Sequence, residues 1–326
     1  MKILRHPDGN VDLERTYDGR TVVRAARSTW TTRYPDELID HVLRVKGPGF
    51  LCDELRRDED PSYVEADLRD GILEFMDASD FQGLRVLDFG CGSGASTILL
   101  SRLLSGASIT GVDFDESSLS LATARARYYS ICNVSFVCSS RPSSISTDLG
   151  IFDAVVLSAV YEHLLPNERV SILSGLWSIL RPGGRLFINQ LPHRWFPFEL
   201  HTTGLPFINY LPDRAALYVA RRFSKHVRYD ETWTELLRAG IRGATRAEIL
   251  SILRHAAPNE PVLIPRRRRG INQLASRSGG RLRSLAKALV VSPVALLGWF
   301  AGEPLVPVIV LAIEKASKGA AQDEET

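Results

Sequence analysis

A glycine-rich turn between an apolar strand and a helix constrains the fold of this chain more than any other feature. Residues 86–94 read VLDFGCGSG, and residues 95–104 after them have the spacing of a buried helix. Glycine allows a tight turn and lets the backbone approach a ligand closely. The first N–H groups of a helix also have no partner within it. The segment therefore predicts a ligand site at the end of a strand in an open α/β sheet.

Strands and helices alternate along the chain after this turn. The pattern predicts strands over 85–89, 108–112, 134–137, 152–157 and 185–189, with helices over 95–104, 116–129 and 168–180 between them. Such alternation implies right-handed crossovers and a mostly parallel sheet. Two further strands are expected over 261–264 and 306–313. The prediction is an α/β fold of the Rossmann-like kind, a seven-stranded sheet with helices on both faces.

The flanking regions suggest four parts. Residues 1–60 are expected to form an N-terminal extension, with a hairpin around Asp18-Gly19 and a short helix over 37–46. Residues 61–191 would form the core, opening with a helix from Pro61 to about Ser79. Residues 192–260 break the alternation, are rich in proline and aromatic residues up to 229, and are expected to be an inserted lid that binds substrate. Residues 261–326 would hold a basic segment and the strand that completes the core sheet.

Composition indicates an ordinary globular protein. The chain has 326 residues, of which 44% are hydrophobic, and a net charge of +2. Its four cysteines include no Cys-x-x-Cys pair, so we predict no metal site and expect reduced, intracellular thiols. The N-terminus lacks the apolar stretch of a secretory signal. We therefore expect a soluble, cytoplasmic protein.

The glycine turn alone admits two interpretations. The spacing Gly90-x-Gly92-x-x-Ala95 also fits a dinucleotide fingerprint, which would make the chain a nicotinamide oxidoreductase. Asp88, however, would repel a pyrophosphate, because like charges repel. An acid at this position suits a cationic or amine-bearing ligand better.

The motif Asp88-x-Gly90-x-Gly92-x-Gly94 resembles motif I of class I S-adenosylmethionine-dependent methyltransferases. The resemblance extends, in that family's order, to ITGVD at 109–113, FDAVV at 152–156 and LRPGGRL at 180–186, and covers about a third of the chain. It implies that S-adenosyl-L-methionine is the cofactor and S-adenosyl-L-homocysteine the product. Agreement across several elements favours it over the dinucleotide interpretation.

The resemblance also implies roles for the matching residues. Asp88 and the backbone of Gly90 and Gly92 would hold the methionine end of the cofactor, with Cys91 in the same turn as a small buried residue. Asp113 would accept hydrogen bonds from the ribose hydroxyls.

Four further positions complete the predicted cofactor site. Phe114 would flank the adenine, and Ser158, at the end of the 152–157 strand, would lie under the reactive end of the cofactor. Ser139 and Ser140 would lie near the adenine amine, where the family often has an acid. At that contact this chain departs from the pattern of the family.

Three histidines are candidate general bases for an alcohol or phenol acceptor. His193 directly follows the 185–189 strand and lies among aromatic residues, so we predict it as the base in an acceptor pocket. His201 is the alternative if that loop folds back, and His163 in YEHL follows the strand over 152–157. Each could instead be a hydrogen-bonded structural residue.

A basic segment followed by an apolar stretch could determine whether the protein binds nucleic acid or a membrane. Residues 261–287 contain Arg266–Arg269 and four more basic residues but no acid. The segment could contact phosphates of nucleic acid or of anionic lipids, or be a solvated surface, which we favour. Proline and Glu303 interrupt the apolar residues 288–313, which predicts at most peripheral contact with a membrane.

These observations predict an S-adenosylmethionine-dependent methyltransferase that methylates an oxygen of a small-molecule, glycan or lipid-linked acceptor. The choice of oxygen draws on a loose resemblance of residues 192–211 to bacterial enzymes of glycan or small-molecule biosynthesis. Nucleic-acid methylation is the alternative, but the Asn/Asp-Pro-Pro-aromatic motif of DNA amino-methylating enzymes is replaced by Ser158-Ala159-Val160-Tyr161. A non-catalytic member that binds the cofactor is a further alternative. The sequence says nothing of the oligomeric state.

Overall fold

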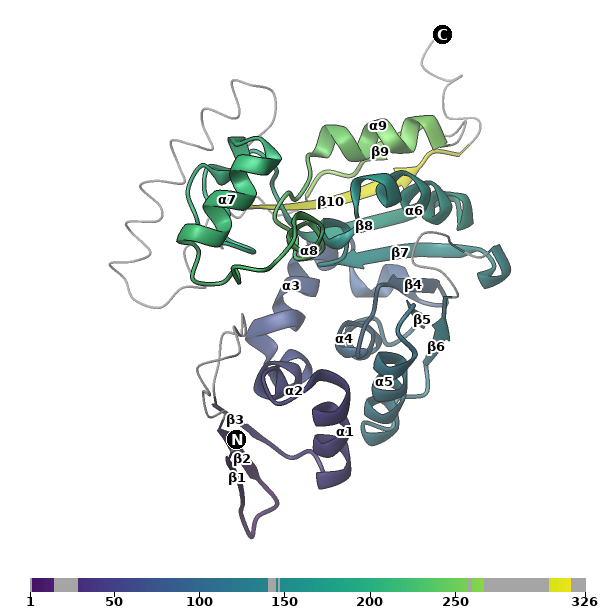
Figure 1. Cartoon of the computed structure of the whole chain (residues 1–326). Helices are drawn as coiled ribbons and strands as arrows, with labels where there is room; N and C mark the ends of the chain where they lie inside the picture. The colour runs from purple at the N-terminus through teal and green to yellow at the C-terminus, as the bar shows by residue number, and fades with distance from the viewer. Residues whose placement is uncertain are drawn as a thin grey trace.

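The computed structural model describes residues 2–14, 29–139, 145, 147–256, 260–266 and 305–317. A seven-stranded sheet dominates these parts, with the strand order β6-β5-β4-β7-β8-β10-β9 (Figure 1). Its strands are β4 (Arg85–Phe89), β5 (Ser108–Asp113), β6 (Val134–Cys138), β7 (Phe152–Ser158), β8 (Leu180–Pro192), β9 (Pro261–Leu263) and β10 (Val308–Lys315). The predicted Rossmann-like fold with a seven-stranded, mostly parallel sheet is confirmed.

Five of the seven strands run parallel, and the predicted ligand site lies at the end of one of these five. β4 lies between β5 and β7, with Leu87 opposite Thr110 and Val155. β8 pairs parallel to β7, whereas β10 pairs antiparallel to both β8 and β9. β4 and β7 are buried for nearly their whole length, as expected for parallel strands covered on both faces.

Helices cover both faces of the sheet. On one face, α6 (Pro166–Ile179) and α9 (Arg246–Ala256) pack together over β7, β8 and β10. On the other face, α4 (Ala95–Leu103) and the helical segment that ends at Leu73 cover the sheet, with α5 (Glu116–Tyr128) beside α4 (Figure 1). Because β5, β4, β7 and β8 run parallel, the turns after them meet at one edge of the sheet.

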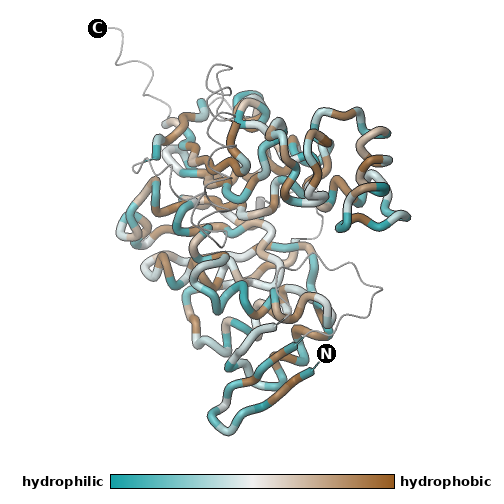
Figure 2. The backbone as a smooth tube through the Cα atoms, turned by 90° about the vertical axis from the view of Figure 1, so that its left-hand side faces the viewer, coloured by the Kyte–Doolittle hydropathy of each residue, from teal (hydrophilic) through white to brown (hydrophobic). Residues whose placement is uncertain are grey.

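The N-terminal region forms a separate small sheet of β1 (Lys2–Arg5), β2 (Val11–Glu14) and β3 (Thr29–Thr32), in that order. Hydrophobic and acidic residues alternate along β2, and Figure 2 shows brown and teal stretches of the tube in the region near the N-terminus. The buried residues of β2 pack on α1 (Asp36–Lys46) and α2 (Leu51–Glu59), and Leu121 of α5 joins this cluster. The N-terminal region thereby adheres to the helix that follows β5.

Several local predictions were wrong. The expected continuous helix from Pro61 is broken at Tyr63, where φ and ψ are −108° and −116°, and its helical turns end at Leu73. α2 and α7 (Asp213–Phe223) were missed, because their sequences were taken for polar and aromatic loops. β8 begins at Leu180, before the predicted start at residue 185, because the turn residues pair with β7.

Other predictions fall on parts of the chain that the structure does not describe. The Asp18-Gly19 turn, Ser140 and the basic and helical residues 267–304 lie outside the described residues. Arg266 is described, and its guanidinium lies 3.3 Å from the carboxylate of Glu74. Among the helices that the structure describes, none has the length and apolar character needed to span a bilayer.

Candidate functional site

The glycine turn after β4 lies at the carboxyl edge of the parallel strands. Gly90, Gly92 and Gly94 have φ values of 76°, 52° and 84°, a region that side chains disfavour. The N–H groups of Gly90 and Cys91 both donate to the carbonyl of Val112 in the neighbouring strand. A Cβ placed on Gly92 would meet no atom within 4 Å, so open space lies above the turn. The turn is therefore open at Gly92, where a ligand can approach the backbone.

Asp113 at the end of β5 faces this turn. One carboxylate oxygen accepts the Gly92 N–H at 2.8 Å, and the other accepts the N–H of Asp115 at 3.0 Å. The carboxylate is partly exposed at the strand edge, so it retains lone pairs for a ligand hydroxyl. Its position fits the ribose contact that the resemblance implies.

Asp88 occupies a different position from the one expected of a direct ligand contact. It is 1% exposed, and one carboxylate oxygen accepts hydrogen bonds from the hydroxyls of Ser96 and Thr97, both at 2.7 Å. Burial raises the pKa of Asp88 to about 6, against the lowering effect of the two hydroxyls. Asp88 thus ties the strand end to the start of α4 and supports the turn from beneath. The Cys91 side chain is also buried, and burial raises the pKa of its thiol.

The remaining predicted cofactor residues surround the same edge. Phe114 is 62% exposed next to Asp113, and the backbone N–H of Ser139 donates to the Asp113 carbonyl at 2.8 Å. Ser158 ends β7 opposite Asn189 of β8 and is half-buried. These residues frame the open space above the glycine turn from both sides.

The segment after β7 connects this edge to a second group of polar residues. A Cβ on Gly90 would lie 2.7 Å from the Val160 side chain, so Val160 packs directly on the glycine turn. A 3₁₀ turn at Tyr161–His163 then presents Glu162 and His163. The Nδ1 atom of His163 lies 2.7 Å from the carbonyl oxygen of Arg238. Because a carbonyl only accepts, Nδ1 carries a proton, and neutral His163 keeps a lone pair on Nε2.

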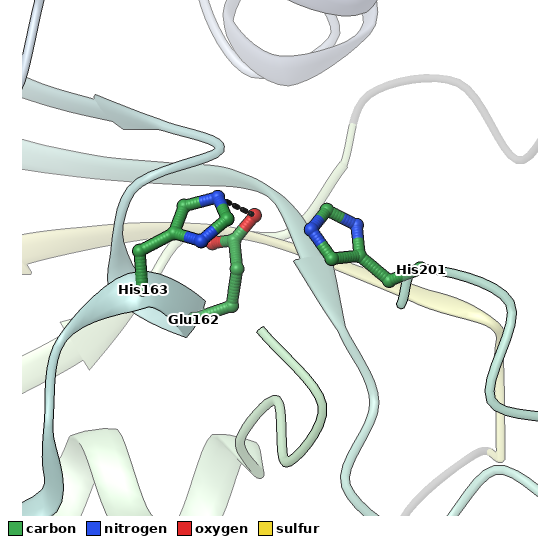
Figure 3. Close-up of side chains that lie close together, drawn as sticks. All are labelled: Glu162, His163 and His201. Atoms are coloured by element: carbon green, nitrogen blue, oxygen red, sulfur yellow. Dashed lines mark ion pairs between the residues drawn. The ribbon is translucent and has the colours of Figure 1, made fainter. Parts of the chain in front are cut away.

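His201 comes from the inserted segment after β8 and lies against this pair. Its ring centroid is 5.4 Å from that of His163, and Figure 3 shows its ring facing Glu162 and His163 from a separate stretch of chain. The backbone N–H groups of His201, Thr202 and Thr203 all donate to the carboxylate of Glu199, which shapes the turn. The structure therefore brings together two of the three predicted catalytic histidines.

His193 lies elsewhere in the same region. Its side chain is 3% exposed, and its Nδ1 accepts the backbone N–H of Trp195 at 3.1 Å. That bond places the proton of the neutral ring on Nε2, so His193 offers a donor there. His193 and His201 both line a cavity of about 130 Å³, together with Gln190, Phe198, Glu199, Asn209 and Arg242.

Glu162 is a site residue that the sequence prediction missed. It is 1% exposed, and neither carboxylate oxygen has a hydrogen-bond partner on another residue in the described part of the chain. Burial raises its pKa to about 8. The adjacent Glu162-His163 pair was visible in the sequence, but only the fold shows that the carboxylate points into the interior.

Comparison with known proteins agrees with this architecture. Residues 86–184 match the family model described as a methyltransferase domain. The ubiquinone biosynthesis O-methyltransferase of rat mitochondria is 31% identical over 38% of this chain and 36% of its own length. The ribosomal protein L11 methyltransferase of Methylococcus capsulatus is 34% identical over 36% of this chain and 37% of its own length. A solved structure of an O-methyltransferase family protein from Burkholderia thailandensis is 13% identical over 83% of this chain and 63% of that one, with a TM-score of 0.46.

The fold, the glycine turn and the family match define the class. Residues 86–184 form an α/β methyltransferase domain. As the resemblance of its motifs implied, this domain is similar to those of class I S-adenosylmethionine-dependent methyltransferases. The matches cover little more than a third of the length of the two curated relatives, and those relatives are named for different acceptors.

Proposed function

We propose that the protein transfers a methyl group from S-adenosyl-L-methionine to an oxygen atom of a small-molecule, glycan or lipid-linked acceptor. The observation that carries this proposal is the contact between Val160 and Gly90. It places Glu162 and His163 two to three residues from the surface on which the cofactor would rest. The expected positions of the cofactor and the acceptor thus lie next to each other at one edge of the sheet. Methyl transfer depends mainly on the proximity and alignment of these two reactants.

The residues at this edge fit the cofactor. The open space at Gly92 leaves room for the methionine portion, and the carboxylate of Asp113 stands where ribose hydroxyls would be bound. Phe114 offers an exposed ring for the adenine, and the carboxylates of Asp88 and Asp113 favour a cationic sulfonium near the turn. Asp88 would act through the turn rather than by touching the ligand. When bound, the cofactor supplies the methyl group and a neutral sulfide leaving group.

The inserted segment fits an acceptor with an apolar or aromatic body. Trp195 and Tyr210 stack with ring centroids 6.1 Å apart, and Phe207 lies 6.3 Å from Phe198 and 6.4 Å from Tyr210. All four rings are at least one-third exposed, and Phe198 also lines the cavity with His193 and His201. A mostly apolar wall with a few convergent polar groups is typical of small-molecule sites.

The geometry favours His163 and His201 over His193 for a catalytic role at the acceptor hydroxyl. The Nδ1–H of His163 donates to the Arg238 carbonyl, and its Nε2 atom lies 3.8 Å from the Glu162 carboxylate, whereas the Nδ1 lone pair of His193 is held by the Trp195 N–H. We assign His193 to the cavity wall, where it orients the acceptor as a donor. Methyl transfer from sulfonium to a hydroxyl requires that the hydroxyl lose its proton as the new C–O bond forms, so a group beside it must favour the alkoxide or phenolate.

Calorimetric titration with S-adenosyl-L-methionine, and separately with NADH, tests this proposal. We expect binding of S-adenosyl-L-methionine that weakens by at least about ten-fold, or about 1.4 kcal/mol, in Asp113→Ala. Glu116→Ala, which removes an exposed acid at the start of α5, is the matched control and should bind like the wild type. Preferential binding of NADH, or no binding of S-adenosyl-L-methionine, would contradict the proposal. A screen of hydroxylated acceptors with the binding-competent protein then tests the oxygen acceptor.

A further inference from the structure

Three side chains that can ligate a metal converge beyond the end of β7. Glu162 and His163 come from the 3₁₀ turn after the strand, and His201 comes from the inserted segment after β8 (Figure 3). One carboxylate oxygen and one nitrogen from each ring all lie within 4.8 Å of one another. The two segments that supply these side chains are separated in the sequence, and the fold brings them together.

The carboxylate of Glu162 is the first observation that points to a cation. It is almost completely buried, and neither oxygen has a hydrogen-bond partner on another residue in the part of the chain that is described. The Nε2 atom of His163 lies 3.8 Å from one of these oxygens. An unpaired buried carboxylate is costly unless a proton or a cation neutralises it.

The orientation of His163 is the second observation. Its Nδ1–H donates to the Arg238 carbonyl, which leaves the Nε2 lone pair directed to the side of Glu162. Histidine ligands of metals characteristically donate their other ring N–H to a carbonyl or carboxylate, which fixes the tautomer and the ring. Arg238 in turn is held by its guanidinium, which pairs with Glu168 at 2.6 Å. These contacts fix the orientation of the His163 ring and therefore the direction of its Nε2 lone pair.

The support of His201 is the third observation. Thr202 donates its hydroxyl to the Ala239 carbonyl at 2.6 Å, which docks the His201 segment against the end of α8 (Trp233–Arg238). Gly240 follows with φ of 91°, and a Cβ there would lie 2.7 Å from His201 and 3.1 Å from Glu162. The backbone therefore leaves room for these two side chains to approach each other.

We propose that Glu162, His163 and His201 bind one divalent transition-metal ion, with Zn²⁺ as the best match. Two imidazoles and one carboxylate, with a further position open, are the ligand set of many catalytic zinc sites. Tetrahedral ligands at about 2.0–2.2 Å from Zn²⁺ lie about 3.4 Å apart. Glu162 and His163 are already near this separation, and modest rotation of the exposed His201 side chain completes it. Mg²⁺ prefers oxygen ligands and does not match two imidazoles.

The position of the site suggests a role, which rests on the proposed function. Val160 connects the ligands to the glycine turn, and His201 also lines the acceptor cavity. An acceptor hydroxyl in the open position of the metal would have a lowered pKa. Its proton would pass to solvent, the oxygen lone pair would form the C–O bond, and the sulfur would keep the electron pair of the broken C–S bond. The acceptor class would then be a phenol or enol that can ligate a metal through oxygen.

Metal binding by the full-length protein, without cofactor or acceptor, provides the test. Protein freed of metal by a chelator is titrated with Zn²⁺ by calorimetry, and with Co²⁺ to record the visible bands of a bound ion. We expect one Zn²⁺ per chain, with at least about ten-fold weaker binding in each of Glu162→Gln, His163→Ala and His201→Ala. His255→Ala, which removes an exposed histidine on α9, should leave binding unchanged. A background with Cys132→Ser and Cys138→Ser excludes binding by the two exposed thiols.

Two results would overturn the metal site. One is the absence of saturable Zn²⁺ binding, and the other is stoichiometric binding that all three substitutions leave intact. Glu162→Gln keeps the shape of the buried side chain and so guards against loss of binding through unfolding, which a thermal melt of each variant monitors. Titration of the same preparations with S-adenosyl-L-methionine separates the two proposals. Cofactor binding without zinc binding rejects only the metal site, and zinc binding without cofactor binding rejects only the proposed function.

Discussion

The carboxylate of Asp113 accepts the backbone N–H of Gly92 at 2.8 Å, which joins the end of β5 to the glycine turn after β4. The bond spans two neighbouring parallel strands and fixes the turn in a shape that already faces open space. Asp113 therefore has a structural role in addition to the ribose contact proposed for it. Substitutions that keep or remove its acceptor oxygen should separate the two roles.

We predict that Asp113→Asn and Asp113→Ala differ in the stability of the unliganded protein. Asn keeps an oxygen for the Gly92 N–H, whereas Ala leaves that donor without its partner, at a cost of about 1 kcal/mol in the free energy of unfolding. Both variants lose the carboxylate, so S-adenosyl-L-methionine should raise the melting temperature of either by much less than that of the wild type. Thermal melts with and without the cofactor measure both effects. Equal stability of the two variants would contradict the structural role.

Gly90→Ala should disrupt the turn through two separable effects. A side chain at φ of 76° costs about 1–2 kcal/mol, and its Cβ would also lie 2.7 Å from Val160. Gly83→Ala is the matched control, since φ there is 74° and no atom lies within 4 Å of the added carbon. We expect a greater loss of unfolding free energy in Gly90→Ala than in Gly83→Ala, measured by urea denaturation. Val160→Ala added to Gly90→Ala should recover part of the difference.

The buried carboxylate of Asp88 should make stability depend on pH. Its pKa is raised from 3.8 to about 6 by burial, near the hydroxyls of Ser96 and Thr97 and the carboxylate of Asp113. Between about pH 4 and 6 the unfolded chain has lost this proton while the folded chain keeps it. The folded state binds more protons, so the Asp88 contribution lowers stability as pH rises through this window and levels off above it. The total change is at most about 3 kcal/mol.

Asp88→Asn isolates that contribution. The free energy of unfolding from urea titrations at pH 4.5 and pH 7 should fall less with rising pH in the variant than in the wild type. Other carboxylates are common to both proteins, so they cancel in the difference. Parallel pH profiles for the two proteins would show that Asp88 does not retain a proton in the folded state.

Arg125 joins the N-terminal extension to the glycine turn. Its guanidinium is fully buried and donates to the carbonyl and hydroxyl of Ser93 and to the backbone carbonyl of Glu54, with the Glu54 carboxylate 3.4 Å away. Arg125→Met should lower the unfolding free energy by about 3–5 kcal/mol, because it removes these buried hydrogen bonds and one of the two guanidiniums, with that of Arg57, that offset the buried Glu54 charge. Arg127→Met, on the exposed face of the same helix, should cost little.

A double variant sharpens that prediction. Adding Glu54→Gln to Arg125→Met removes a buried charge that has lost part of its compensation, so the pair should be more stable than Arg125→Met alone. Additive losses in the double-mutant cycle would mean that the two side chains are not coupled.

The sequence predicted those features that are local in the chain. The bounds of β4 were predicted without error, and β5, β6 and β7 within one residue, because their apolar runs end at glycine, acid or serine signals. The helix α2 was missed because its buried face has only three apolar residues, Leu51, Cys52 and Leu55, and also includes the acids Glu54 and Asp58. The helix α7 was missed because its buried residues, Ala216 and Ala220, are small and follow an aromatic segment typical of a loop.

The juxtaposition of His163 and His201 lay beyond prediction for a different reason. It depends on the turn that Glu199 shapes and on the bond between Thr202 and Ala239, neither of which leaves a periodic signal. The sequence therefore named both histidines but treated them as alternatives. It assigned no metal and no role to Glu162, whose significance comes only from its burial.

Gly240 tests whether the approach of His201 to Glu162 matters. Gly240→Ala adds a Cβ 2.7 Å from the His201 ring and 3.1 Å from the Glu162 side chain, at a φ of 91° that disfavours alanine. We expect the variant to fold with a loss of about 1–2 kcal/mol, since the strain is local. Because the added carbon must displace one of the two side chains, Zn²⁺ binding should weaken by at least about ten-fold. Binding of S-adenosyl-L-methionine should stay within about two-fold of the wild type, since the glycine turn is untouched.

Gly204→Ala supplies the comparison for Gly240→Ala. Gly204 lies in the same inserted segment with φ of 71°, but its added carbon would come no closer than 3.8 Å to another atom, in His226. It should therefore carry a similar backbone penalty and leave Zn²⁺ binding unchanged. If both variants weakened Zn²⁺ binding equally, the loss would reflect general loosening of the inserted segment. If Gly240→Ala bound Zn²⁺ as the wild type does, the close approach of His201 and Glu162 would not be required for the metal site.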